Sequence, residues 1–265
     1  MQIGIVIPPG APIRRAMAAA IVVLVIVGVA AGVGRAFRAG EGLSRDPATR
    51  AATVRQDEAL YGVFRQTSLI AAGTPRDVAM RKNFFDGQRK FEEYPVSTLL
   101  HVVPGVLFMV LGPLQLLRGL RSRFPLVHRW SGRVLLVTGI PLAGSALYIV
   151  WLAPGAGWRE TAVVTVFALV FVVSGAMGWT AIRRGDRGRH REWMIRFLAA
   201  GLAISTVRLV AVLIAIAATR ISVESAFVLS MVVGWVMTLG LAEAWIRATR
   251  RQSRPSTVPA PLIPV

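Results

Sequence analysis

Residues 161–182 read TAVVTVFALVFVVSGAMGWTAI and contain no charged side chain. A bilayer core is about 30 Å thick, and a helix of about 20 apolar residues crosses it. Lipid offers no partner for backbone N–H and C=O groups, so such a block must form a helix that pairs them internally. The sequence therefore predicts an all-α integral membrane bundle with six transmembrane helices. The other five apolar blocks are residues 16–34, 96–117, 130–153, 193–218 and 226–246.

The composition of the whole chain also indicates a membrane protein. Of its 265 residues 54% are hydrophobic and 17% are charged, and the mean hydropathy is +0.58. Soluble domains carry about 25% charged residues. The formal net charge of +18 comes from arginines at the ends of the apolar blocks, which favours a role in topology over nucleic-acid binding. The absence of cysteine excludes disulfides, thiolate catalysis and cysteine-ligated metal centres.

Arginines are concentrated in alternate connections between the blocks. The opposite short loops carry one basic and one acidic residue each, Arg159 with Glu160 and Arg220 with Glu224. Short loops rich in Lys and Arg stay in the cytoplasm, so we expect both termini and the arginine-rich connections on that side, where they would attract anionic lipids. These connections hold Arg118, Arg121, Arg123, Arg129 and Arg133, then Arg183, Arg184, Arg187, Arg189 and Arg191, and finally Arg247, Arg250, Arg251 and Arg254.

The remaining segments are polar. Helical spacing of apolar residues at 57–64 and 78–91 predicts a partly helical extracytoplasmic segment. Four prolines without periodicity after residue 251 predict a disordered tail. The first block exceeds the length of about 7–15 residues usual for the hydrophobic region of a signal peptide, so we expect a retained anchor rather than a cleaved signal. The expected division is an N-terminal helix (1–34), the extracytoplasmic segment (35–95), a five-helix core (96–247) and a cytoplasmic tail (248–265).

The chain has three histidines, and each lies near the end of a predicted span. His128 and His190 precede the cytoplasmic starts of the third and fifth spans. His101 lies about one turn into the second span from the other side. A helix rises 1.5 Å per residue, so His128 and His190 are expected at similar depth, with His101 most of a membrane away.

Three stretches that begin with these histidines occur in a recognisable order. They are HVVPGVLFMVLGPLQ (101–115), HRWSGR (128–133) and HREWMIR (190–196), followed by Val207-Arg208-Leu209. Together they resemble the domain of unknown function 2306 (DUF2306) family of predicted bacterial membrane proteins, roughly from Glu93 to Arg247. The resemblance implies a multi-helix protein of the bacterial cytoplasmic membrane without an assigned reaction.

The two cytoplasmic histidines suggest a haem site. Imidazole is an axial ligand of haem iron, and helical bundles build such sites from side chains on facing helices. In this hypothesis His128 and His190 bind the iron. Arg129, Arg133 or Arg196 would contact the propionates. In the alternative interpretation each histidine hydrogen-bonds a neighbouring loop or a lipid headgroup.

A metal ion is a second hypothesis for the same place. A carboxylate from Glu243 or Glu192 would complete a two-histidine, one-carboxylate set with His128 and His190, which suits iron or zinc. The alternative for Glu243 is a salt bridge, either to the arginine at i+4 or to Arg196 across the bundle.

Arg208 is the most costly residue in the predicted spans. It stands 15 residues into its block, and a central arginine costs at least about 2.5 kcal/mol. It is therefore expected to face the bundle interior and contact an anion, a quinone or a propionate in an outer cavity. The alternative is a side chain that extends to the outer surface. Candidate partners are Glu92, Glu93, Glu160, Glu224, helix carbonyls and His101.

The remaining polar signals are weaker. Gly112, Pro113 and Gln115 either line a polar pocket or serve packing. A phosphate-binding loop, a nucleophile–histidine–acid set and paired carboxylates within a span are all missing, which argues against an enzyme. The leading hypothesis is a non-catalytic or redox-accessory membrane protein, with a haem or metal site near the cytoplasmic face. Its rivals are a small permease with an anion site at Arg208 and His101, and a scaffold that binds anionic lipids.

Overall fold

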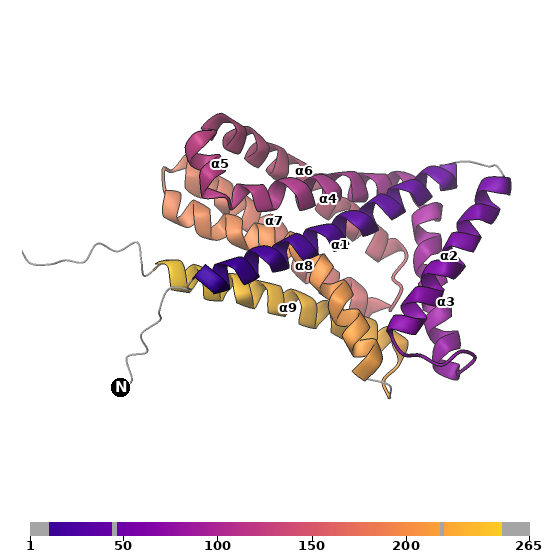
Figure 1. Ribbon diagram of the computed structural model, residues 1–265. Helices are drawn as coiled ribbons and strands as arrows, with labels where there is room; N and C mark the ends of the chain where they lie inside the picture. Colours follow the sequence, from indigo (N-terminus) through magenta and orange to yellow (C-terminus); the bar gives the residue numbers. More distant parts are fainter. Residues whose placement is uncertain (1–10, 44–46, 218–219, 251–265) are drawn as a thin grey trace, which may run out of the picture.

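The structure is a computed structural model that describes residues 11–43, 47–217 and 220–250. Within these ranges the chain is helical, without strands (Figure 1). The helices are α1 (Ala11–Leu43), α2 (Pro47–Thr67), α3 (Pro75–Glu93), α4 (Pro95–Gln115), α5 (Arg118–Arg123), α6 (Pro125–Leu152), α7 (Trp158–Arg183), α8 (Arg187–Ala217) and α9 (Val223–Arg250). The predicted tail lies outside the described residues from position 251 onward.

Six of these helices are long and apolar enough to cross a membrane, namely α1, α4, α6, α7, α8 and α9. The prediction of an all-helical bundle with six spans is therefore confirmed. The helices extend beyond the apolar blocks because polar residues at a membrane boundary can continue the helical hydrogen bonding. Thus α6 begins at Pro125, a residue suited to the first helical position, and α1 continues past residue 34 to Leu43.

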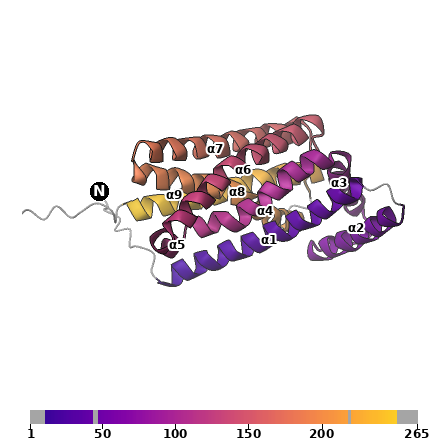
Figure 2. The same cartoon turned by 90° about the horizontal axis from the view of Figure 1, so that it is seen from above.

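An aromatic cluster lies at the centre of the bundle. Phe197 of α8 packs against Phe108 of α4 and Phe171 of α7, with ring centroids 5.1 and 4.4 Å apart. Trp235 of α9 stacks on Phe167 at 4.6 Å, and its indole N–H donates to the Ala200 carbonyl at 3.0 Å. In Figure 2 α1 lies along α4 on the opposite side of the bundle from α7. The apolar faces of α4, α6, α7 and α8 thus meet in one cluster, and those of α7, α8 and α9 meet in a second, with α1 outside both.

Close helix approach depends on glycine where α8 meets α9. A Cβ added at Gly234 of α9 would lie 2.7 Å from the Cα atom of Val207 in α8. Real Cβ atoms do not approach backbone so closely, and small residues permit tight packing of membrane helices. The backbones of α8 and α9 therefore approach closely beside Arg208.

Helices α2 and α3 form a polar unit at one end of the bundle, which we call the cap (Figure 1). Both predicted helical stretches of the segment are helical. Thr74 caps α3 by accepting from the Asp77 backbone N–H at 3.2 Å, and Pro75 occupies its first position. The Tyr61 hydroxyl donates to the Asp77 carboxylate at 2.6 Å and joins α2 to α3.

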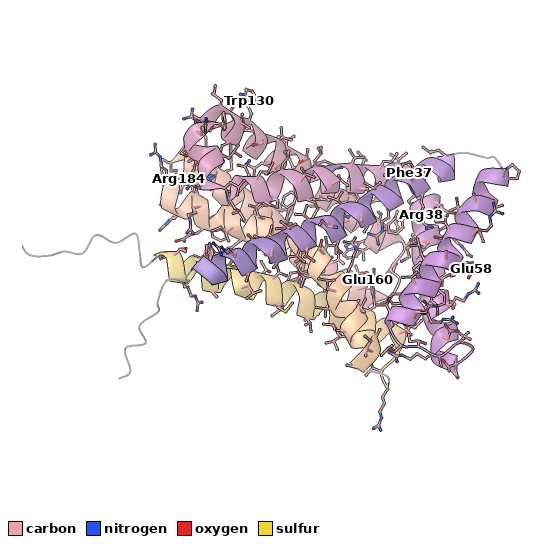
Figure 3. The ribbon with its side chains drawn as sticks, in the orientation of Figure 1. Phe37, Arg38, Glu58, Trp130, Glu160 and Arg184 are labelled. Atoms are coloured by element: carbon pink, nitrogen blue, oxygen red, sulfur yellow. The ribbon has the colours of Figure 1, made fainter. Side chains whose placement is uncertain are left out.

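The cap is attached to the ends of α8 and α9. Tyr61 and Met80 form an apolar cluster with Ala215 of α8 and Val223 of α9. Arg76 donates to the carbonyl of Ala215 at 3.2 Å. The end of the bundle that carries α2 and α3 is the cap end. The opposite end, with α5 and the α7–α8 turn, is the loop end. Figure 3 shows Arg38 and Glu58 at the cap end, and Trp130 and Arg184 at the loop end.

Candidate functional site

The loop end contains two of the three histidines. His128 lies in the first turn of α6 and His190 in the first turn of α8. Both residues therefore lie at the same end of the bundle. His101 lies in α4 at the cap end, where it interacts with other charges. The structure thus brings together the two histidines that were expected at similar depth and separates the third.

The ring nitrogens of His128 and His190, the loop-end pair, differ in their hydrogen bonds. Nδ1 of His190 lies 2.8 Å from the carbonyl oxygen of Gly178 in α7, so the Nδ1–H donates and Nε2 keeps its lone pair. Nδ1 of His128 is buried, and no described group forms a hydrogen bond with it. A buried ring nitrogen without a partner is unusual. Nε2 of His190 therefore retains capacity to bind a further group.

The arginines at the loop end differ in whether they are paired with a carboxylate. Arg196 forms a bidentate pair with Glu243, whose second contact measures 3.1 Å, and stacks on Trp193 at 4.7 Å. Arg129 and Arg133 are exposed. No carboxylate among the described side chains lies within ion-pair distance of either. Arg129 and Arg133 are thus available for an external anion, whereas Arg196 is already paired.

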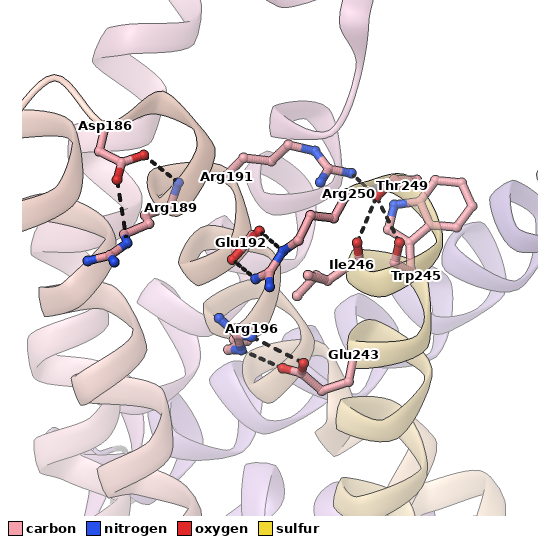
Figure 4. A network of polar contacts seen from close by, with 10 residues as sticks. All are labelled: Asp186, Arg189, Arg191, Glu192, Arg196, Glu243, Trp245, Ile246, Thr249 and Arg250. Carbon is pink, nitrogen blue, oxygen red and sulfur yellow. Dashed lines mark hydrogen bonds and ion pairs between the residues drawn. The ribbon is translucent and has the colours of Figure 1, made fainter. Parts of the chain in front are cut away.

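The carboxylates suggested as a third metal ligand are both bound to arginine. Glu243 pairs with Arg196, and Glu192 accepts from Nε of Arg250 at 2.6 Å (Figure 4). In the described ranges no three His, Cys, Asp or Glu residues are grouped so that they could hold a metal ion. The salt bridge from Glu243 to Arg196 was the alternative interpretation of that residue. The structure thus gives His128 and His190 no carboxylate as a third ligand.

Gln115 connects α4 to α6. Its amide donates to the Ser131 hydroxyl at 2.6 Å, and the side chain is buried. Its Oε1 lies 3.4 Å from where a Cβ of Gly132 would be. These contacts give Gln115 a packing role between two helices.

Arg208 lies at the cap end with few contacts. Its guanidinium donates to the Ile204 carbonyl at 3.5 Å, which is at the limit for a hydrogen bond. Among the expected partners, a helix carbonyl is therefore the one it contacts. No carboxylate of the described side chains lies within 4.0 Å of it. Glu160, one of the expected partners, instead accepts from the backbone N–H of Ala156 at 2.7 Å.

Sequence reasoning missed Arg35 as a neighbour of Arg208. Arg35 belongs to the last third of α1 and follows Gly28 by seven residues, and Arg208 follows Ser205 by three. Gly28 packs against Ser205, so the two arginines lie on facing sides of α1 and α8. Arg35 was assigned to the polar segment because the apolar block ends at residue 34. The spacing of Arg35 and Arg38 at i and i+3, which shares a helix face, was the signal that could have identified them.

His101 completes the cap-end group. Its Nδ1 lies 3.1 Å from the Leu142 carbonyl and 3.3 Å from the Ser145 hydroxyl. These two groups of α6 fix the orientation of the ring. The imidazole is close enough to Arg35 and Arg208 to interact with their charges.

Comparison with known proteins identifies the family. Residues 98–246 match the family described as "Predicted membrane protein (DUF2306)". No curated protein and no solved structure matches the chain. The matched segment runs from α4 to α9, so it includes all three histidines and Arg208 but not Arg35 or the cap. Since the match covers more than half of the chain, this protein belongs to the DUF2306 family of predicted membrane proteins.

Proposed function

We propose that this polytopic membrane protein is a redox-accessory protein that binds haem through His128 and His190. The observation that carries the proposal is the state of the two imidazoles. They lie at the same end of the bundle, Nε2 of His190 is left available, and Nδ1 of His128 is buried without a described partner.

The number of protein ligands favours haem over a bare metal ion. Haem supplies four equatorial nitrogens, so its iron needs only axial ligands from the protein. Zinc and non-haem iron sites take at least three protein ligands. Among the described residues no third His, Cys, Asp or Glu joins the pair. Two histidines are therefore sufficient for haem but not for a bare metal ion.

The surroundings of the pair agree with this assignment. The hydrogen bond from His190 Nδ1–H to the Gly178 carbonyl orients the ring and makes Nε2 a better ligand. Arg129 and Arg133 are exposed near His128 and can pair with carboxylates such as the haem propionates.

The proposal also includes an orientation. The loop end carries the arginine-rich connections, so the positive-inside rule puts it in the bacterial cytoplasm, with both chain termini. The exposed arginines would then contact anionic lipids of the inner leaflet. Electrons would enter or leave near the cytoplasmic face, and the cap would lie outside.

The pocket described in the structure does not itself support the anion permease. A permease needs a cavity that reaches Arg208 from outside. A pocket of about 550 Å³ near the cap end is lined by residues of α6, α7 and their connection. These are Trp151, Pro154, Trp158, Thr161, Ala162, Thr165 and Val166, and Arg208 is not among them.

An absorption spectrum tests the haem proposal directly. Protein expressed with ample haem and purified in detergent should show a Soret band, with α and β bands that sharpen after reduction with dithionite. His128→Ala and His190→Ala should each abolish these bands. His101→Ala should retain them, because that histidine lies at the cap end. A flat visible spectrum of the wild type, or bands that persist in both loop-end variants, would overturn the proposal. The lipid scaffold predicts the flat spectrum.

A further inference from the structure

Three arginines lie close together within the spans at the cap end. Arg35 and Arg38 come from α1, and Arg208 comes from α8. Helix α1 packs on α8 at Gly28, where an added Cβ would lie 2.8 Å from the Ser205 Oγ, and Arg35 and Arg208 lie about two turns and one turn further toward the cap on these facing sides.

Arg38 pairs with Asp57 of α2, and both side chains are almost fully buried. Among the described side chains, no carboxylate forms an ion pair with Arg35 or Arg208. Counted over the described side chains, the group therefore has two positive charges in excess.

The contacts of Arg35 and Arg208 do not neutralise this charge. The guanidinium of Arg35 stacks on the Phe91 ring of α3 at 4.6 Å, and Arg208 has only the distant carbonyl of Ile204. Two like charges at membrane depth repel each other and are costly to bury. Side chains free to extend to the surface would separate. Their proximity indicates that an anion belongs between them.

The shape of the side chains restricts the anion. A guanidinium presents a planar fork of N–H donors that pairs with two oxygens of one group. Two guanidinium groups therefore suit a tetrahedral phosphate, whose oxygens can serve both forks, better than a carboxylate with two oxygens in all. We propose that Arg35 and Arg208 bind a phosphate group at the cap end of the bundle.

The surrounding elements enclose this site. The ion pair of Arg38 with Asp57 ties α1 to α2, and Phe91 of α3 covers Arg35. The imidazole of His101, held by the Leu142 carbonyl, lies within electrostatic range of both arginines. The phosphate group thus sits between α1, α4 and α8 beneath the cap. It belongs either to free phosphate or to a phospholipid headgroup. The site is at the opposite end from the histidine pair and does not depend on haem.

Thermal unfolding of the full chain in detergent tests the site. One arm compares inorganic phosphate with chloride at equal ionic strength. The other compares phosphatidylglycerol with a diacylglycerol, which lacks the phosphate group, in mixed micelles. A ligand at about 100 times its Kd should raise the midpoint by about 5 °C. The shift should be lost in Arg35→Gln and Arg208→Gln. Arg220→Gln removes an exposed arginine from the α8–α9 connection at the same end and should keep it.

The two arms also identify the source of the phosphate group. A shift with inorganic phosphate supports a solute site, and a shift with phosphatidylglycerol alone supports a headgroup site. If either glutamine variant fails to fold, Arg35→Lys and Arg208→Lys replace it in the test. Lysine keeps the positive charge but lacks the planar fork of N–H donors. Each lysine variant should therefore reduce the shift in the midpoint at least twofold. The proposal is wrong if neither ligand shifts the wild-type midpoint, or if all variants that remove or replace the two arginines keep the full shift.

Discussion

Arginines at the two ends of the bundle differ in their partners. At the loop end Arg196 pairs with Glu243, and Arg250 pairs with Glu192, so that α8 is joined to α9 (Figure 4). At the cap end Arg35 and Arg208 lie near each other without a described carboxylate. From the sequence, the loop-end arginines were interpreted by their number in the connections and Arg208 by its depth in the span, and Arg35 was not considered.

The difference shows that the role of an arginine in a membrane protein depends on its depth in the bilayer. Near the boundary, water, headgroups and carboxylates on adjacent turns are all available, so an arginine can set topology and also pair with its neighbour. Within a span few groups can serve as partners. An arginine retained there without a carboxylate indicates a ligand, as we propose for Arg35 and Arg208.

The largest expected effect is on the helix packing that positions the cap-end arginines. Gly234→Ala would push a Cβ into the backbone of Val207, the neighbour of Arg208, at 2.7 Å from Cα and 2.8 Å from N. Backbone cannot yield as a side-chain tip can, so we expect a loss of about 3 kcal/mol in the free energy of unfolding. Thermal unfolding in detergent measures it, and the response to phosphate should fall as well.

Gly240→Ala is the matched control for this change. It lies on the same helix, and no atom lies within 4 Å of its added Cβ. The substitution should not lower the midpoint, because alanine is the better helix former. Equal losses for both variants would show that α9 responds to any alanine and not to the contact with Val207.

A smaller effect is expected for the loop-end pairs. A double-mutant cycle with Arg196→Gln and Glu243→Gln should give a coupling free energy of about 1 kcal/mol, since both side chains are partly buried and bidentate. The same cycle on Arg250 and Glu192 should give less, because Arg250 is 61% exposed and salt screens it. Stronger coupling in the exposed pair would contradict the role of depth.

The smallest effect is confined to the cap. The Tyr61 hydroxyl and then the Gly73 backbone N–H hold the pKa of Asp77 below its usual range. The carboxylate therefore stabilises the cap at neutral pH, and this contribution disappears as the pH falls through the folded-state pKa. Hydrogen exchange in α2 and α3 should be faster in Asp77→Asn than in the wild type at pH 7. The two should converge in acid, with the bundle unaffected.

Asp86→Asn provides the comparison for this prediction. Asp86 is also in α3, but it pairs with Lys82 in an exposed contact between adjacent turns. Its removal should change exchange in the cap less than Asp77→Asn does. If both variants behave alike at pH 7, the bond from Tyr61 to Asp77 does not hold the cap together.

Sequence periodicity and length were sufficient for the spans and for the depth of each histidine. Six apolar blocks became six long helices because a backbone in lipid has no alternative to internal hydrogen bonding. The rise per residue predicted that His128 and His190 share one end and that His101 lies at the other. Those quantities are local to one helix, so no knowledge of helix packing was needed.

Partners across helices were decided by the tertiary structure. The sequence left open whether Glu243 is a metal ligand or forms a salt bridge. In the folded bundle α8 packs against α9, and Glu243 pairs with Arg196. Arg35 was assigned to a polar segment, yet the extension of α1 to Leu43 brings it close to Arg208, which is far away in sequence. Sequence gives each charge a depth in the membrane. Only the packing of helices determines which charges at that depth face one another, because rotation about a helix axis is fixed by its neighbours.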